Sequence, residues 1–458
     1  MGKQVHAGPR LDRLPMTKRH YSILMLLAGG GFFDGFDIYL AGSVLASMVA
    51  MKFSTVAGNA SFISSTFFGL LFGTLIAAAL GDRLGRKFTL KYSLLVYGIF
   101  TILCAIAPSF GWLIAFRAIA GLGLGSVIVV GYGMWVEFTP KHTRGFWTGA
   151  LSFLINLSQP AAALVALYFI PDFGWRVMFW IAGIPPILVW ALQVRYLPES
   201  PRWLEEKGKS EEAEKVLVQF EKHVKDLPPA TVYSQAAKSQ RKKVISLWSP
   251  GIRTITLLSI IISTFTMTTW YTFTAWIPTF FIKQGFSEVK TFTFSLVIML
   301  GAIPGNALAA WLMDRVGRKY TLAVISLLLG IIAVMYGGSK SPVEIMTLGF
   351  IYVMGGNILI AVILASYIPE LFPTSIRMTG SSLANAFGRA GTIVSPYLIA
   401  YLFTHGGQNA VFWSSCAMYV IMALAILFLG RETKQMSLEE IEKEEIMDNN
   451  YESGTKFI

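Results

Sequence analysis

Two aspartates stand inside the first long apolar segment of the chain, within the run Phe32-Phe33-Asp34-Gly35-Phe36-Asp37. Because they are three residues apart, a helix carries Asp34 and Asp37 on one face. A carboxylate at the centre of a membrane helix costs about 2.5–3.5 kcal/mol on insertion scales. We therefore expect this face to point toward other helices or a water-filled cavity. Ionisable groups in such places commonly carry protons or bind substrates.

The composition indicates that lipid surrounds the segment with these two acids. The 458 residues are 54% hydrophobic and only 14% charged, whereas soluble proteins average about 25% charged residues. Apolar runs of roughly 20 residues recur, each long enough to cross about 30 Å of hydrocarbon as a helix. We predict an all-α membrane protein with twelve spans, at residues 21–47, 59–80, 88–107, 111–137, 146–170, 177–197, 252–281, 291–312, 320–338, 344–368, 379–403 and 409–430.

An internal repeat divides the chain into two halves. Three landmarks recur after an offset of 232 or 233 residues: Asp82-Arg83-Leu84-Gly85-Arg86-Lys87 as Asp314-Arg315-Val316-Gly317-Arg318-Lys319; Glu137, Pro140 and Arg144 as Glu370, Pro373 and Arg377; and Glu199 as Glu432. A nearly constant offset predicts two homologous six-helix bundles in parallel orientation. The expected parts are an N-terminal tail 1–20, a first bundle 21–197, a linker with short helices 198–250, a second bundle 251–430 and a C-terminal tail 431–458.

The positions of the charges predict the orientation. Of the 38 Lys and Arg residues, five fall in outward loops, two lie deep in spans and 31 lie on the other side. An excess of Lys and Arg marks the cytoplasmic side, so both tails are expected in the cytoplasm. This distribution accounts for the net charge of +12 without a nucleic-acid partner.

Cysteine and histidine offer no catalytic or metal-binding cluster. The two cysteines, Cys104 and Cys416, fall in spans of different halves, and the five histidines fall in tails or loops. We therefore expect no metal, no cofactor and no enzymatic activity. A nucleotide-binding loop is also missing from the sequence, so we do not expect ATP to be an energy source for this protein.

Over nearly its full length the chain resembles the major facilitator superfamily. The doubled D-R-x-G-R-K motif is similar to the family's loop signature, although Ala78 and Ala310 stand where Gly is usual. Arg117-x-x-x-Gly121-x-Gly123-x-Gly125 resembles its fourth-helix motif. The segments Pro198-Glu199-Ser200-Pro201-Arg202-Trp203 and Pro369-Glu370-Leu371-Phe372-Pro373-Thr374 resemble the branch of sugar porters and metabolite symporters. The resemblance implies two bundles that rock about a midplane site.

Two further motifs narrow the resemblance within that branch. Asp34-Gly35-Phe36-Asp37 resembles the D-G-x-D of aromatic-acid:proton symporters. Gly388-Arg389-Ala390-Gly391 with Pro396 is similar to the eleventh helix of those symporters and of organic-anion and synaptic-vesicle-protein-like transporters. Span seven lacks the paired glutamines of sugar porters, and span ten lacks their Gly-Pro-x-x-Trp element. Both differences argue against a hexose.

Asp37 and Arg117 are expected at nearly the same depth in the membrane. Asp37 is about 24 Å from the inner end of its span, and Arg117 is about 9 Å from the outer end of span four, in a core of about 30 Å. The resemblance implies that such a pair couples transport to protons. Arg does not lose its proton, so Asp37 is the titrating partner. The alternative is a permanent ion pair that only fixes helix packing.

Other deep polar groups are candidates for substrate binding. Arg389 is about 15 Å into span eleven, and its planar fork suits a carboxylate; the alternative is that it pairs with Asp34. Asp34 itself is a second protonation site, a substrate contact or a packing acid. Further candidates to line the cavity are Asn156, Gln159, Trp270, Tyr271, Asn357 and Asn385.

The repeated loop motifs predict a cytoplasmic gate. Its residues are Asp82, Arg86, Glu137, Arg144, Asp314, Arg318, Glu370 and Arg377. The alternative is a set of ordinary surface ion pairs, each worth about 0–1 kcal/mol.

These features predict a monomeric, multi-pass protein of the bacterial inner membrane that carries a small organic anion together with protons, with an aromatic carboxylate as the narrower expectation. Its partners would be the substrate, protons and the lipid bilayer. Two alternatives stay open. One is a proton-coupled carrier of sugars or polyols, in which Arg389 is structural; the other is a membrane receptor that does not transport.

Overall fold

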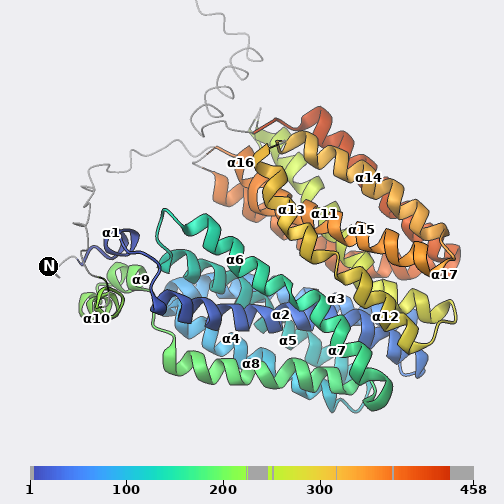
Figure 1. Cartoon of the computed structure of the whole chain (residues 1–458), viewed down its shortest axis with the longest axis horizontal. Helices are drawn as coiled ribbons and strands as arrows, with labels where there is room; N and C mark the ends of the chain where they lie inside the picture. Colours follow the sequence, from blue (N-terminus) through green and yellow to red (C-terminus); the bar gives the residue numbers. More distant parts are fainter. Residues whose placement is uncertain are drawn as a thin grey trace, which may run out of the picture. The chain divides into compact units, whose positions relative to one another are not determined.

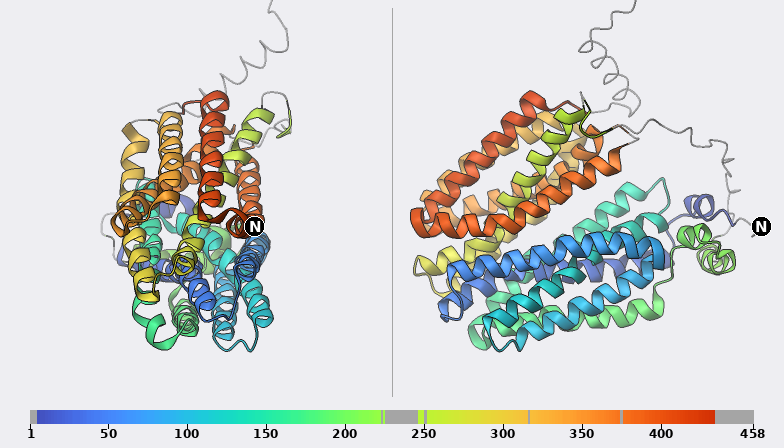
Figure 2. Two further views of the ribbon diagram at one scale, coloured as in Figure 1. Left: turned by 90° about the vertical axis from the view of Figure 1, so that its right-hand side faces the viewer. Right: turned by 180° about the vertical axis from the view of Figure 1, so that it is seen from behind.

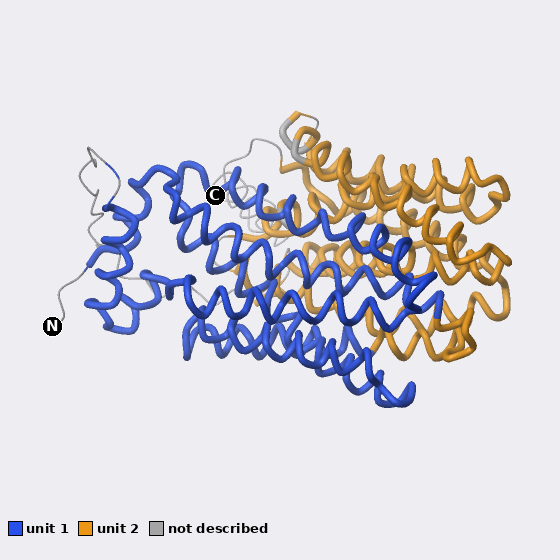
Figure 3. The backbone as a smooth tube through the Cα atoms, turned by 60° about the horizontal axis from the view of Figure 1, so that its bottom comes forward, with its two compact units in different colours: residues 1–47, 65–238 blue, residues 48–64, 239–458 orange. Residues whose placement is uncertain are grey.

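The computed structural model describes residues 5–222, 224, 246–249, 252–315, 317–373 and 376–433, without the side chains of Ala310, Met313, Asp314 and Ala365. Over these residues the chain is helical, and no strand occurs among them (Figure 1). They fall into two compact units, Met1–Ser47 with Ser65–Lys238 and Met48–Ser64 with Ser239–Ile458 (Figure 3). The helices of each unit run alongside one another (Figure 2).

The first six spans are formed by seven helices. They are α2 (Lys18–Ala50), α3 (Val56–Leu84), α4 (Arg86–Ala105), α5 (Phe110–Phe138), α6 (Arg144–Asn156), α7 (Ser158–Phe173) and α8 (Arg176–Tyr196). Helices α6 and α7 together form span five and are separated by a turn at Leu157. The physical cause is Pro160, which has no N–H to bond to the carbonyl of Asn156.

The remaining spans follow the same pattern. They are formed by α11 (Ile252–Lys283), α12 (Glu288–Met299), α13 (Ala302–Arg315), α14 (Lys319–Gly338), α15 (Pro342–Val362), the π-helix η1 (Ile363–Tyr367), α16 (Ile368–Leu371) and α17 (Arg377–Leu429). Pro304 lacks the N–H that the carbonyl of Leu300 would accept, and the break between α12 and α13 lies there.

The predicted fold class is confirmed: an all-α membrane protein with twelve spans. Eleven helical segments of the described residues are long and apolar enough to cross a membrane. The longest, α17, leaves helical geometry at Gly407, with φ 67° and ψ −167°. This positive φ suits glycine, and it divides α17 into spans eleven and twelve.

Three short helices lie together at one end of the first unit (Figures 1 and 2). They are α1 (Ala7–Asp12), α9 (Pro201–Glu206) and α10 (Ser210–Glu221). The short helices expected in the linker are therefore seen in part, and residues 223, 225–245 and 250 of that linker lie outside the described residues. Helix α1 lies in the segment that the sequence presents only as a polar tail.

Glycine permits α3 and α5 to pack very closely. A Cβ on Gly69 would lie 2.0 Å from the carbonyl oxygen of Ala118, and one on Gly125 would lie 2.1 Å from that of Leu70. Small residues at such crossings are common between membrane helices. The close approach brings the side chain of Thr66 on α3 within reach of Arg117 on α5.

Candidate functional site

The structure brings Asp37 and Arg117 together in the first unit. Arg117 Nη1 donates to Asp37 Oδ2 at 2.7 Å, and both side chains are 0% exposed. The two residues come from α2 and α5, and their levels agree with the depth estimate. An ion pair withdrawn from water in this way is stable only while both partners are charged and well aligned.

Three more helices enclose this pair. Arg117 Nε donates to Thr66 Oγ1 on α3 at 3.1 Å, and Thr101 Oγ1 on α4 donates to Asp37 Oδ1 at 3.5 Å. Arg117 Cζ lies 5.8 Å from the centroid of the Phe179 ring on α8. The charges are thus held by neutral hydroxyls and by an aromatic face, which attracts a cation.

Asp34 lies one turn earlier on α2 and is also fully buried. The neighbouring Gly35 explains how the helix packs there, because a Cβ on it would lie 2.4 Å from Ser158 Oγ. The acid-bearing part of α2 therefore packs tightly against the start of α7. The role of Asp34 stays a prediction.

The other candidates of the first unit meet at the break in span five. Gln159 Nε2 donates to Asn156 Oδ1 at 3.3 Å. Asn156 is half-buried, whereas Gln159 is buried. These two amides thus flank the turn between α6 and α7.

The candidates of the second unit differ in exposure. Trp270 is 2% exposed, and its ring lies 2.6 Å from the position of a Cβ on Gly356, so it fills the packing between α11 and α15. Asn357 is also buried and donates to the carbonyl of Val353 at 2.9 Å. Tyr271 is half-buried on α11. The structure thus places Trp270 in the core of its unit, which sequence reasoning did not anticipate.

Asn385 and Arg389 lie four residues apart on α17, on one face of the helix. Both are half-buried, and Asn385 Nδ2 donates to the carbonyl of Ser381 at 3.0 Å. An arginine with part of its surface exposed inside a membrane span can reach a ligand anion.

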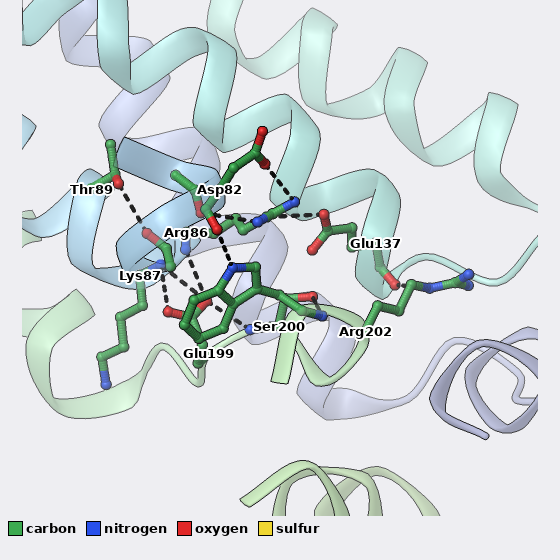
Figure 4. Close-up of polar contacts among 11 residues, drawn as sticks. Asp82, Arg86, Lys87, Thr89, Glu137, Glu199, Ser200 and Arg202 are labelled. Carbon is green, nitrogen blue, oxygen red and sulfur yellow. Dashed lines mark hydrogen bonds and ion pairs between the residues drawn. The ribbon is translucent and has the colours of Figure 1, made fainter. Parts of the chain in front are cut away.

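The gate candidates of the first unit form a network around Arg86 (Figure 4). Its Nη2 lies 3.2 Å from Asp82 Oδ1, and its Nε donates to Glu137 Oε1 at 3.1 Å. Arg144, another of the gate candidates, makes its ion pair with Asp12 rather than with Glu137. It lies 3.2 Å from Asp12 Oδ1 and donates to the carbonyl of Thr139.

Glu199 caps the start of α4 next to this network (Figure 4). Its carboxylate accepts hydrogen bonds from the backbone N–H groups of Arg86 and Lys87 at 3.1–3.2 Å, where the helix dipole favours an anion. Gly85 has φ +105°, and a Cβ there would lie 2.3 Å from Glu199 Oε2. Burial raises the pKa of Glu199, and the backbone N–H bonds oppose that shift. Sequence reasoning used Glu199 as a landmark but missed this role.

The second unit repeats the cap. Glu432 accepts from the backbone N–H of Arg318 at 2.8 Å and of Lys319 at 3.1 Å, beside Gly317 with φ +105°. Arg318 Nε lies 3.3 Å from Glu370 Oε2, which also accepts from Thr433. The side chain of Asp314 lies outside the described residues, and Arg377 begins α17.

Helix α1 is a member of the first network that the sequence did not reveal. Asp12 Oδ1 accepts from Arg144 at 3.2 Å and from Arg202 at 2.9 Å. Arg10 bonds both Glu214 and Glu221 of α10. The pKa of Glu221 is held below its ordinary value, first by the hydrogen bonds from Arg10 and then by Arg13, against partial burial.

Glu205 of α9 completes this contact. Its carboxylate accepts from the backbone N–H groups of Val5, His6 and Ala7 at 2.7–2.9 Å. The hydrogen bonds that α1 and the residues next to it make with these partners join residues about 130 to 210 positions apart, so no local sequence pattern predicts them.

Known proteins share the sequence features and the fold of this chain. The profile of the family described as "Sugar (and other) transporter" matches residues 23–444. The chain belongs to this family. It is therefore a multi-pass membrane protein of the major facilitator superfamily and a transporter of small molecules, and its relatives are transporters rather than enzymes.

Two curated relatives of this transporter cover almost the whole chain. The inner membrane metabolite transport protein YdjE of Escherichia coli is 35% identical over 95% of this chain and 98% of its own. The niacin transporter NiaP of Acinetobacter baylyi is 33% identical over 94% of this chain and 98% of its own. A crystal structure of a D-xylose–proton symporter matches with a TM-score of 0.73 at 20% identity, over 91% of this chain and 99% of that one, which supports the fold.

Proposed function

We propose that this transporter is a symporter that carries a small organic anion together with protons, by alternating access, across a bacterial inner membrane. It works as a single chain with both termini in the cytoplasm. The observation that carries the proposal is the Asp37–Arg117 ion pair, 2.7 Å long and fully withdrawn from solvent.

The pair supplies the coupling step. Arg117 keeps its charge at every physiological pH, so a proton enters or leaves at Asp37. Protonation removes the counter-ion of a buried cation, which costs several kcal/mol unless the surroundings change. A rearrangement of helices that follows protonation relieves this cost, and this links proton entry to alternating access.

The substrate class rests on Arg389 and on the relatives. Arg389 is a half-buried residue in span eleven, and its guanidinium suits a carboxylate. Niacin, named for the relative from Acinetobacter baylyi, is an aromatic carboxylic acid. More distant relatives are named a gentisate transporter and a 4-hydroxybenzoate transporter. These names support an aromatic carboxylate as the substrate, with Asn385, Tyr271, Asn156 and Gln159 as further candidates to bind it.

Uptake into proteoliposomes tests the proposal. We would impose an inward proton gradient and measure radiolabelled niacin, 4-hydroxybenzoate, xylose and glucose for the wild type, Asp37→Asn and Arg389→Ala. We expect gradient-driven carboxylate accumulation, abolished by Asp37→Asn and reduced at least tenfold by Arg389→Ala, the loss of about 1.4 kcal/mol of binding or more.

Two outcomes would contradict it. Accumulation that persists in Asp37→Asn removes Asp37 from coupling. Gradient-driven sugar uptake that survives Arg389→Ala replaces the anion with a neutral substrate. His405→Ala is the matched control, because His405 is exposed and lies near the Gly407 bend of the same helix.

A further inference from the structure

A threonine hydroxyl contacts each of the two charges of the Asp37–Arg117 pair. Thr66 Oγ1 accepts from Arg117 Nε at 3.1 Å, and Thr101 Oγ1 donates to Asp37 Oδ1 at 3.5 Å. Thr66 and Thr101 are 5% and 0% exposed, so both hydroxyls are withdrawn from bulk solvent. The two hydroxyls come from different helices, α3 and α4, and each faces one charge of the pair.

These contacts act in opposite directions on a proton at Asp37. The Thr101 hydroxyl donates to the carboxylate and so favours its ionised form. The Thr66 oxygen and the face of Phe179, 5.8 Å from Arg117 Cζ, turn negative ends toward the guanidinium. Thr66 and Phe179 therefore continue to stabilise the Arg117 guanidinium after Asp37 has been protonated and the ion pair is lost. For this reason they favour the protonated form of Asp37.

We propose that Thr66 and Thr101 are positioning residues for proton coupling, which set from opposite sides the pH at which Asp37 exchanges its proton. This inference rests on the proposed function of the pair. Tyr97 and Cys104 on α4 are ionisable groups that interact electrostatically with Asp37 and Arg117, and Asp34 on α2 interacts with Tyr97. They are the same in every variant below, so they do not contribute to a difference between variants.

The test is the pH dependence of transport in two matched variants. Valine replaces threonine with nearly the same shape but without the hydroxyl. With Thr66→Val, we expect the external pH of half-maximal uptake to fall, because Arg117 is less well held when Asp37 is protonated. With Thr101→Val, we expect it to rise, because the carboxylate loses a donor. Each shift should be about half a unit to one unit, a fraction of what a hydrogen bond to a charged group contributes.

Two further variants distinguish a positioning role of the hydroxyl from a general loss of transport activity. Thr66→Ser keeps the hydroxyl and should restore the wild-type profile even if its maximal rate is lower. Thr74→Val removes another α3 hydroxyl, which donates to the carbonyls of Leu70 and Gly125, and should leave the midpoint unchanged. A purely structural role for Thr66 would change the rate of uptake and not its midpoint pH.

The outcomes distinguish this inference from the proposed function. Opposite shifts in the two valine variants support it. Shifts of the same sign, or unchanged midpoints in both, overturn it while leaving Asp37 as the coupling residue, provided that Asp37→Asn abolishes gradient-driven accumulation. If Asp37→Asn still accumulates substrate, the proposed function fails first.

Discussion

At the residue scale, the glycines at the crossing of α3 and α5 are as important for the site as its charged residues, because they have no side chain to keep the two helices apart. Gly69 and Gly125 occupy positions where α3 and α5 meet backbone to backbone, and this contact brings Thr66 to Arg117. Gly131, further along α5, has no atom outside its own stretch of helix backbone within 4 Å of the position of its Cβ. The same helix therefore contains glycines that packing requires and one that it does not.

We predict that Gly125→Ala destabilises the protein by about 1–3 kcal/mol or more, the usual cost of an overpacked contact, because a Cβ would lie 2.1 Å from the carbonyl oxygen of Leu70. Thermal unfolding in detergent measures this as a lower melting temperature. Gly131→Ala is the control and should be neutral or slightly stabilising, since alanine favours a helix. Equal losses in both variants would show that close α3–α5 packing is not the cause.

At the scale of elements, α1 binds to α9 and α10 through ion pairs as well as through apolar packing, since Ala7 and Leu11 are buried in the same hydrophobic cluster as Leu217 and Phe220 of α10. Arg10 and Arg13 contact Glu221, Asp12 contacts Arg144 and Arg202, and Glu205 caps the start of α1. Exposed ion pairs are worth little singly, but this set fixes one short helix at several points. A device of this kind depends on pH and on salt.

We predict that α1 loosens from α10 in acid. The pKa of Glu221 is lowered from its ordinary value of 4.5, first by hydrogen bonds from Arg10. Its stabilising contribution is therefore fully present above pH 4.5 and is lost as the pH falls through the lower, folded-state pKa. Hydrogen exchange of amides in α1 and α10, compared at neutral and acidic pH, measures this loss.

Glu221→Gln should remove most of that pH dependence by loosening α1 already at neutral pH. Glu211→Gln is the matched control, because Glu211 is an exposed acid on the same helix. Acid-induced exchange that is identical in the wild type and in Glu221→Gln would count against Glu221 as the anchor.

At the scale of the whole molecule, two units with the same architecture carry different charges at depth. The caps by Glu199 and Glu432 occur in both units, each beside a glycine with φ +105°. Asp34, Asp37 and Arg117 occur only in the first unit, and Arg389 occurs only in the second. Repetition therefore marks the scaffold, and its interruption marks the residues that we assign to coupling and binding.

We predict that aromatic carboxylates raise the melting temperature of the whole protein, whereas sugars do not. A ligand that binds only the folded state adds about 2.7 kcal/mol of stability at 100 times its Kd. The purified transporter, titrated with niacin and with xylose at neutral pH, provides the measurement. Arg389→Ala should reduce the shift caused by niacin, and a shift with xylose alone would contradict the anion proposal.

Hydropathy alone specified the spans, because a bilayer accepts only apolar segments whose backbone groups are satisfied internally. The pairing of Asp37 with Arg117 also followed from depth, since both residues lie on long regular helices of known rise. Spacing could not reveal the partner of Arg144, because Asp12 is 132 residues away. The same holds for Thr66 and Thr101, whose contacts exist only because glycine lets α3 approach α5 and because α4 lies beside α2. Contacts between distant segments depend on the packing of the completed bundle, and a local pattern contains no information about that packing.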